Sequence, residues 1–189
     1  METLTKEEKL ILYKCNNDFN KVIENYDYLY KISDNPREFI FRLVEILKVD
    51  NLYWDYISRY KDLSENFIRE FQDKLDWYAI SKYQKLSEDF IKEFKDKLDW
   101  FYISEYQELS EDFIREFKDK VDWFYISQHQ KLSENFIRDF QDKVEWYYKS
   151  KNHKLSEDFI RDFQDKVNWY CIIRYQDLSD EFKKEFDLV

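Results

Sequence analysis

Hydrophobic and polar positions along this chain repeat with a period of 23 residues. The segment LSENFIREFQDKLDWYAISKYQK at 63–85 recurs four more times in tandem, and a shortened copy, LSDEFKKEFDLV, ends the chain. An earlier, degenerate unit aligns with it, because Trp54 stands one period before Trp77. A fixed period of this length is typical of solenoids, in which each unit packs only against its neighbours.

Each unit predicts two short helices. Ser64 stands at an N-cap position, and the apolar residues that follow it, from Phe67 to Phe71, have the spacing of one helical face. Asp76 is placed to cap a second helix over 77–84. Helices this short are marginal in isolation, so neighbouring units must supply their packing.

The pattern therefore predicts an all-α fold, an α-solenoid of stacked short helix pairs. A leucine-rich-repeat-like α/β solenoid is the alternative, because the period suits it and VDWFYIS at 121–127 is rich in strand-favouring aromatics. The complete absence of glycine and the helical SEDFIREFKDK half favour helix pairs.

We expect an N-terminal helical cap, an array of tandem helical repeats and a truncated C-terminal capping repeat. The cap covers 1–35, the array covers 36–177 and the last repeat covers 178–189. The array consists of one degenerate unit and five full units, which are 36–62, 63–85, 86–108, 109–131, 132–154 and 155–177.

Two columns of the repeat are expected to be structural. The invariant tryptophans predict a core between repeats, and the glutamines at the end of the second helix predict hydrogen bonds to neighbouring backbone. The columns are Trp54, Trp77, Trp100, Trp123, Trp146 and Trp169, and Gln84, Gln107, Gln130 and Gln176.

Composition narrows the class of partner. With 21% aromatic residues the chain should fold despite its 38% charged residues. The formal charge of −10 makes nucleic acid an unfavourable partner. Two distant cysteines, Cys15 and Cys171, favour a reducing cytoplasmic location over a disulfide framework, and no apolar run is long enough to cross a membrane.

Catalytic chemistry has few candidates. His129 and His153 occupy non-equivalent repeat positions, which favours drift over an acid-base pair, and Cys171 has no base placed beside it. The carboxylates lie among Lys and Arg, as on a solvated helix surface, so no metal is expected. Without glycine the chain cannot build a phosphate-binding glycine loop. We expect a non-enzymatic protein with no cofactor.

Columns that vary between repeats are better candidates for a binding surface. Two such columns lie four residues apart on the second helix and form a tyrosine-rich stripe, suited to protein recognition or to packing between helices. The candidate protein-binding residues are Tyr56, Tyr60, Tyr83, Tyr102, Tyr106, Tyr125, His129, Tyr148 and Tyr175.

Two units depart from the pattern. In 132–154, Lys149 replaces a core isoleucine and His153 replaces the glutamine, which should loosen the second helix. In 155–177, Ile173 replaces a small serine, so the stacking geometry should change toward the C-terminal end.

The string LSEDFIREFKDKVDWFYIS, carried in tandem over about 52–186, resembles an uncharacterised class of short-repeat proteins encoded by giant DNA viruses and related AT-rich genomes. The resemblance implies a viral or phage origin and carries no activity or binding residue with it.

These observations favour a scaffold that binds another protein, either a host or a defence component, with a basic protein among the options. An acidic inhibitor that mimics nucleic acid is one alternative, since the unit at 86–108 is rich in acids. A structural protein that self-associates through incompletely capped ends is the other.

Overall fold

The computed structural model describes residues 6, 9, 12–13, 18–24, 51–59 and 63–188. All secondary structure in this part of the chain is α-helical. This confirms the all-α solenoid and leaves no place for the leucine-rich-repeat-like alternative, which needs a strand in every unit. The predicted cap at 1–35 and the degenerate unit at 36–62 lie mostly outside the described residues.

The chain divides into two compact units, residues 1–99 and 100–189. In each full repeat the first helix is called the A helix and the second the B helix. Among the described residues of the N-terminal unit, the helices with assigned bounds are α2 (Phe19–Glu24), α5 (Asn51–Ser58), α6 (Glu65–Glu70), α7 (Trp77–Tyr83) and α8 (Glu88–Glu93).

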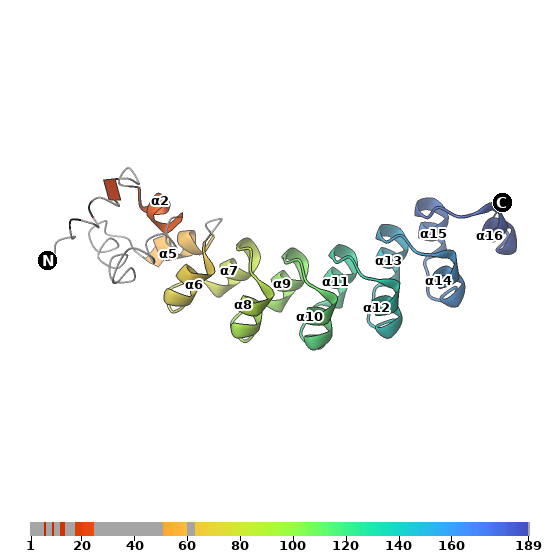
Figure 1. Ribbon diagram of the computed structural model, residues 1–189, viewed down its shortest axis with the longest axis horizontal. Coiled ribbons are helices and arrows are strands. Elements are labelled where there is room, and N and C mark those ends of the chain that lie inside the picture. Colours follow the sequence, from red (N-terminus) through yellow and green to blue (C-terminus); the bar gives the residue numbers. More distant parts are fainter. Residues whose placement is uncertain are drawn as a thin grey trace. The chain divides into compact units, whose positions relative to one another are not determined.

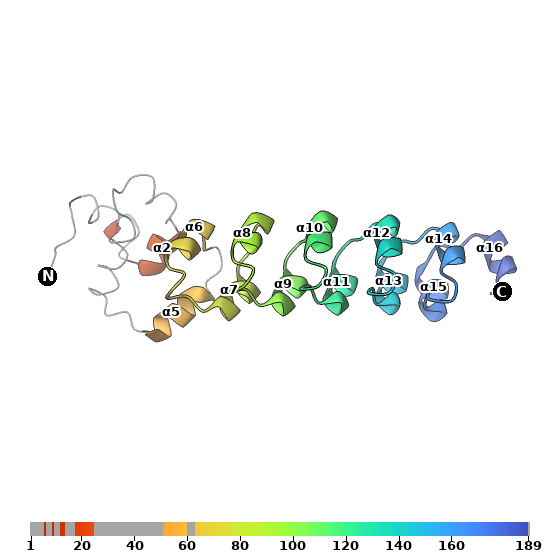
Figure 2. The same ribbon diagram turned by 90° about the horizontal axis from the view of Figure 1, so that it is seen from below.

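The C-terminal unit alternates B and A helices without interruption (Figure 1). Its B helices form one row and its A helices a second row, as the view from below shows (Figure 2). The B helices are α9 (Trp100–Tyr106), α11 (Trp123–His129), α13 (Trp146–Asn152) and α15 (Trp169–Tyr175). The A helices are α10 (Glu111–Glu116), α12 (Glu134–Asp139), α14 (Glu157–Asp162) and α16 (Asp180–Glu185).

The predicted caps are confirmed at both helix starts. The Ser64 hydroxyl accepts a hydrogen bond from the Phe67 N–H at 3.2 Å, and the Asp76 carboxylate accepts one from the Tyr78 N–H at 3.0 Å. The A helix ends at Glu70, one residue before Phe71, the last of the apolar positions from which it was predicted. The chain continues as a turn through Lys74. These caps satisfy N–H groups that a helix start leaves without partners.

Phenylalanine and isoleucine of the A helices form the centre of the core. Phe113, Phe136 and Phe159 are at most 1% exposed, and the isoleucine after each is fully buried. The tryptophans of the C-terminal unit are only half-buried, yet each stacks across to the next A helix. Trp123, for example, lies 5.0 Å from Phe140, measured between ring centroids. The tryptophan column therefore joins successive repeats, as expected, but at the edge of the core.

Serine and glutamine side chains connect the successive B helices of their row. The Ser127 hydroxyl accepts the Glu145 N–H at 2.8 Å, and Ser150 accepts the Asn168 N–H at 2.9 Å. The Gln130 side chain accepts the Leu109 N–H at 3.1 Å and donates to the Gln107 carbonyl at 2.7 Å. The prediction that the glutamines bond neighbouring backbone is confirmed.

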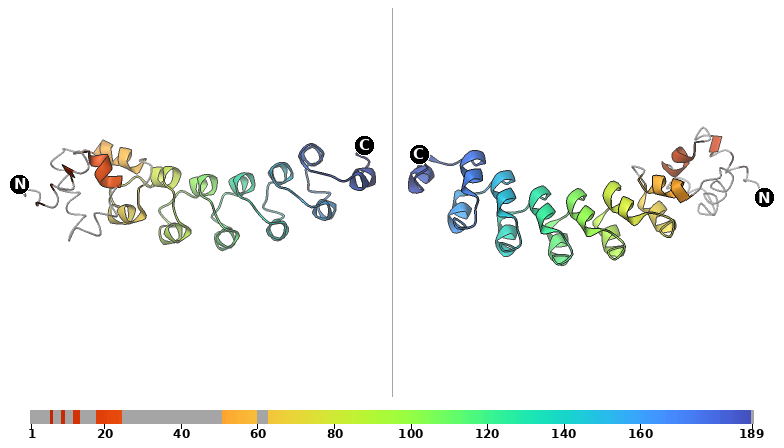
Figure 3. Two further views of the ribbon diagram at one scale, coloured as in Figure 1. Left: turned by 45° about the horizontal axis from the view of Figure 1, so that its top comes forward. Right: turned by 180° about the vertical axis from the view of Figure 1, so that it is seen from behind.

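Arginines connect the outer surface of the A helices in the same way. Arg115 pairs with Asp139 at 2.6 Å and lies 4.8 Å above the Phe136 ring. Arg138 repeats the arrangement with Asp162 in the next unit. Further views show the helices of each row side by side (Figure 3). No helix in the described part of the chain is both long and apolar enough to cross a membrane.

Candidate functional site

The outward face of the B helices in the C-terminal unit carries a continuous strip of aromatic rings. We define the aromatic strip as Phe101, Tyr102, Tyr106, Phe124, Tyr125, His129, Tyr147 and Tyr148. In α9 and α11 the isoleucine and serine at the fourth and fifth positions are buried and the tryptophan at the first is half-buried, which leaves the other positions to face outward. The repeat pattern itself therefore produces the strip.

Rings of the strip contact one another within and between helices. Tyr102 stacks on Tyr106 in α9 with 6.1 Å between centroids, and Tyr125 stacks on His129 in α11 at 6.2 Å. Phe101 meets Tyr125 edge to face at 4.7 Å and so joins α9 to α11.

The same edge-to-face contact continues the strip into α13. Phe124 lies 5.2 Å from Tyr148, again measured between ring centroids. Edge-to-face and offset stacking are the favourable geometries for aromatic pairs. The three helices therefore share one ordered aromatic surface.

The structure brings most of the predicted binding residues together. Five of them belong to the strip, namely Tyr102, Tyr106, Tyr125, His129 and Tyr148. Tyr175 is exposed on α15, and Tyr83 is exposed on α7 of the N-terminal unit. Tyr60 and the Tyr56 side chain lie outside the described residues.

The predicted binding residues do not include the ring that follows each tryptophan. Phe101, Phe124 and Tyr147 are 41%, 44% and 45% exposed, whereas Tyr102, Tyr125 and Tyr148 are less exposed than this. The signal was present in the repeat, because a residue one step after a buried position lies about 100° away around the helix. Tyr106, at 51%, is more exposed than any of these three rings, so the accessible surface of the strip comes both from a predicted column and from one that was not predicted.

Carboxylates lie close to the α9 and α11 part of the strip. Burial raises the pKa of the Tyr125 hydroxyl, and the negative charges of Glu105 and Asp122 raise it further. Both carboxylates favour cations near these rings. On α13 and α15 the position equivalent to Glu105 holds Lys151 and Arg174, so the charge changes sign along the row.

The unit at 132–154 replaces the glutamine bonds with a lysine and a histidine. The His153 Nε2 lies 3.2 Å from the Leu132 backbone nitrogen and 2.9 Å from the Gln130 carbonyl oxygen. The Lys149 Nζ lies 3.1 Å from that Nε2 and 3.3 Å from the same oxygen. One ring nitrogen cannot accept and donate at once, whereas a glutamine has separate atoms for the two roles.

The Leu132 N–H can only donate, so the ring nitrogen that faces it accepts. His153 Nε2 accepts the Leu132 N–H, and the Lys149 amine donates to the Gln130 carbonyl oxygen in place of the glutamine NH₂ group. The neutral ring then carries its proton on Nδ1, which is buried without a hydrogen-bond partner. Together the two side chains do what one glutamine does in the other repeats, at the cost of one unmet polar atom.

Burial shifts both groups toward their neutral forms. Lys149 is fully buried, and burial lowers its pKa from 10.5 to about 7. Burial and the Lys149 charge lower the pKa of His153 from 6.5 to about 4. The helix keeps its length, since α13 and α11 each have seven residues, but the N-cap residue Glu145 makes no side-chain bond, and the loosening of this helix stays a prediction. Because the lysine side chain is fully buried, it offers no nucleophile to a substrate.

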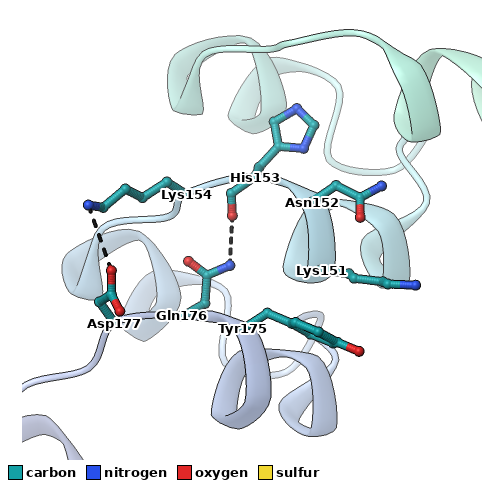
Figure 4. A pocket seen from close by; sticks show the side chains of 7 residues that line it. All are labelled: Lys151, Asn152, His153, Lys154, Tyr175, Gln176 and Asp177. Carbon is teal, nitrogen blue, oxygen red and sulfur yellow. Dashed lines mark hydrogen bonds and ion pairs between the residues drawn. The ribbon is translucent and has the colours of Figure 1, made fainter.

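A pocket of about 240 Å³ lies beside this unit, between the ends of α13 and α15 (Figure 4). It is lined by Lys151, Asn152, His153, Lys154, Tyr175, Gln176 and Asp177. The His153 imidazole points away from Tyr175 and Gln176, while the His153 carbonyl accepts the Gln176 side-chain N–H at 2.6 Å. The pocket therefore has a polar lining and does not contain the buried lysine.

The remaining candidates for chemistry are dispersed. His129 is exposed in the strip, far along the sequence from the buried pair, and Cys171 is a buried free thiol. Within the described part of the chain, no three His, Cys, Asp or Glu side chains come together in a way that could hold a metal ion.

Comparisons with protein-family models, with curated proteins and with solved structures find no match to this chain.

Proposed function

We propose that this chain is a non-enzymatic scaffold that binds another protein through the aromatic strip. The observation that carries the proposal is the exposure of Phe101, Phe124 and Tyr147, which are 41% to 45% exposed on three successive B helices. Phe101 and Phe124 each contact a tyrosine of the next B helix, yet more than two fifths of each side chain stays exposed to solvent. Large exposed apolar patches on a folded protein mark interaction sites.

The rings of the aromatic strip are already held in place, which favours high affinity for a partner. Each ring is held by stacking or edge-to-face contacts before a partner arrives. Aromatic side chains provide large contact areas at low entropic cost, and rigid rings lose little further freedom on binding. Such residues dominate the energy of protein interfaces.

Charge beside the strip supports a basic partner segment. Glu105 and Asp122 flank Tyr125, and the whole chain carries a formal charge of −10. Arginine side chains both stack on aromatic faces and pair with carboxylates. The resemblance to repeat proteins of giant DNA viruses supports a host or defence protein as the partner, and the two well-separated cysteines support a cytosolic location.

The test is a binding measurement with matched variants. The partner is isolated from lysate on the full chain, identified, purified and titrated against each protein by calorimetry. We expect the triple variant Phe101→Ser/Phe124→Ser/Tyr147→Ser to bind at least about tenfold more weakly, since removing central aromatics typically costs more than 1 kcal/mol each.

The control carries three exposed substitutions on the A row, Lys118→Ser, Asp112→Ser and Asn135→Ser. It should bind like the unchanged chain, and circular dichroism checks that both variants are folded. Equal affinity of the strip variant and the control would contradict the proposed surface. A basic partner predicts an affinity that falls as salt rises, whereas indifference to salt would rule out the role of Glu105 and Asp122.

A further inference from the structure

The exposed ring at the second position of each B helix shares a face with the side chain at the sixth position. On α13 the Lys151 Nζ lies 5.6 Å from the centroid of the Tyr147 ring, and on α15 the Arg174 Nη1 donates to the Tyr170 hydroxyl at 3.4 Å. Residues four apart on a helix are surface neighbours, so a partner contacts both members of each pair together. We define the outer lane as Phe101 and Glu105 on α9, Phe124 and Gln128 on α11, Tyr147 and Lys151 on α13, and Tyr170 and Arg174 on α15.

The charge of the outer lane changes sign from one end to the other, while each helix keeps an aromatic ring. Its sixth position is acidic in α9, neutral in α11 and basic in both α13 and α15. At the acidic end, Glu108 follows Glu105 by three residues and is exposed. Glu145 stands before the start of α13, at the opposite end of that helix from Lys151. The outer lane is therefore negative over α9 and becomes positive along the row.

The basic end of the outer lane adjoins the pocket between α13 and α15 (Figure 4). Lys151 and Tyr175 both line this pocket, and the Lys151 Nζ lies 5.9 Å from the Tyr175 ring centroid. The Asp177 carboxylate lies 3.9 Å from the Lys154 Nζ, so the charges of these two lining residues offset each other. The exposed Lys151 and Arg174 thus set the local charge, which suits a carboxylate side chain.

We infer that the outer lane binds an extended segment of a partner protein that places a basic side chain over α9 and an acidic side chain over α13 and the pocket. This inference rests on the proposed function, because it specifies the chemistry of the segment that the aromatic strip holds. The rings between the two charged ends contact apolar side chains of the segment. Opposite charges at the two ends fix which end of the segment lies over which helix.

The packing of the B helices sets the distance between the two charges of the segment. The α9 and α11 helices pack through the Phe101 and Tyr125 rings, and the same contact recurs between α11 and α13. Packed helices lie about 8 to 10 Å apart, so two repeats separate Glu105 from Lys151 by about 16 to 20 Å. An extended chain advances about 3.3 Å per residue, which places the basic and acidic residues of the segment about five or six positions apart.

Selection from a random peptide library displayed on phage tests this chemistry. The peptides have about 12 residues, enough to span the outer lane when extended. They are selected on the immobilised full chain and counter-selected on the folded variant Phe101→Ser/Phe124→Ser/Tyr147→Ser. We expect the selected peptides to carry Arg or Lys about five or six residues from Asp or Glu, with apolar residues between them.

The selection separates failure of this inference from failure of the proposed function. Peptides that need the three rings but carry one sign of charge, or no fixed spacing, overturn the inference and leave the aromatic strip as a binding surface. If no peptide prefers the unchanged chain to the triple variant, the strip itself is not a binding surface and both fail.

Fluorescence anisotropy with the tightest selected peptide then measures each charge contact. Glu105→Lys should weaken binding at least about tenfold, because it sets like charges together, and the loss should disappear when the basic residue of the peptide is replaced by Gln. Lys151→Glu should act in the same way through the acidic residue. Losses that persist with the Gln peptides would overturn the inference.

The matched controls make the same charge changes on the exposed A row. Asp112→Lys and Lys118→Glu should bind the peptide like the unchanged chain, because both positions lie away from the outer lane. Circular dichroism checks that all four variants are folded. Equal losses in the controls and in the lane variants would show that net charge alone governs binding, which would also overturn the inference.

Discussion

At the scale of single residues, the pair of Lys149 and His153 is the clearest departure from the repeat. Five other B helices place isoleucine where Lys149 lies. A buried lysine with no carboxylate beside it is expected to lower stability, because the protein replaces its water shell only in part. The cost depends on pH, since the folded chain disfavours the charged form of both groups.

We predict that the double variant Lys149→Ile/His153→Gln stabilises the chain at pH 7 by about 2 to 4 kcal/mol. Between pH 7 and 10.5 the unfolded lysine binds a proton that the folded one has lost, so the stability of the unchanged chain rises with pH. The advantage of the variant should therefore shrink as pH is raised toward 10. Denaturant unfolding at several pH values measures it, with Lys151→Ala as the exposed control on the same helix.

Measuring the stability of the two proteins at lower pH tests the histidine in the same way. Between pH 6.5 and 4 the unfolded His153 is protonated while the folded ring stays neutral, so the unchanged chain loses stability as pH falls through this range. The double variant lacks this loss, and its advantage should grow again on the acid side. An advantage that is the same at pH 5, 7 and 10 would show that neither group is held neutral by the fold.

At the scale of helices, α13 also has a weaker start than α11. Glu145 stands at its N-cap and makes no side-chain cap bond, whereas Asp122 bonds the Phe124 N–H at 2.9 Å in α11. The longer glutamate side chain does not reach the N–H groups of the first turn in the same geometry.

Glu145→Asp should therefore stabilise the chain by about 0.5 to 1 kcal/mol. The reciprocal change Asp122→Glu should destabilise it by a similar amount, and urea midpoints of the two variants give the comparison. Because both substitutions keep the charge, a shift of the same sign in the two variants would argue against capping as the cause.

Helix positions and caps were readable from the sequence because they depend on neighbours within one turn. Ser64 and Asp76 were predicted and observed as caps. The role of Trp123 was harder to predict, since a period identifies a shared face but not how deeply the next repeat covers it. For the same reason the strip was predicted from Tyr102 and Tyr125, while the more exposed Phe101 and Phe124 were missed.

The hydrogen-bond arrangement of Lys149 and His153 could not be predicted from the repeat pattern. From the two substitutions the sequence predicted a loosened helix. It did not predict that the two side chains share one task, which depends on atoms brought together from Gln130 and Leu132 of the preceding repeat junction. Compensation of this kind needs the distances between four groups, and a single sequence does not contain them.

At the scale of the whole molecule, stability in such an array is set repeat by repeat, because each unit contacts only its neighbours. The unit at 132–154 combines a buried lysine with an incomplete cap. Its backbone bond from the His153 N–H to the Lys149 carbonyl is 3.3 Å, compared with 3.1 Å for the Gln130 N–H to the Ile126 carbonyl in the repeat before it.

We expect local opening to concentrate at α13. Native-state hydrogen exchange should show amides of α13 exchanging about tenfold faster than the equivalent amides of α11. In the variant Lys149→Ile/His153→Gln the two helices should exchange at similar rates. Uniform exchange across the C-terminal unit of the unchanged chain would mean that it opens as one cooperative block.

The serine bond between B helices has a consequence for changes in chain length. Ser127 bonds the backbone of Glu145 and Ser150 bonds that of Asn168, an identical offset along the chain. If residues 132–154 were deleted, Ser127 would meet Asn168 at that same offset, and each later contact would keep its partner. Loss or duplication of one whole unit therefore keeps the spacing of the core contacts, whereas removal of a single residue would change the spacing of every bond that spans the deletion. The number of repeats, and with it the length of the aromatic strip, is therefore the property of this protein that can change with the least effect on its core.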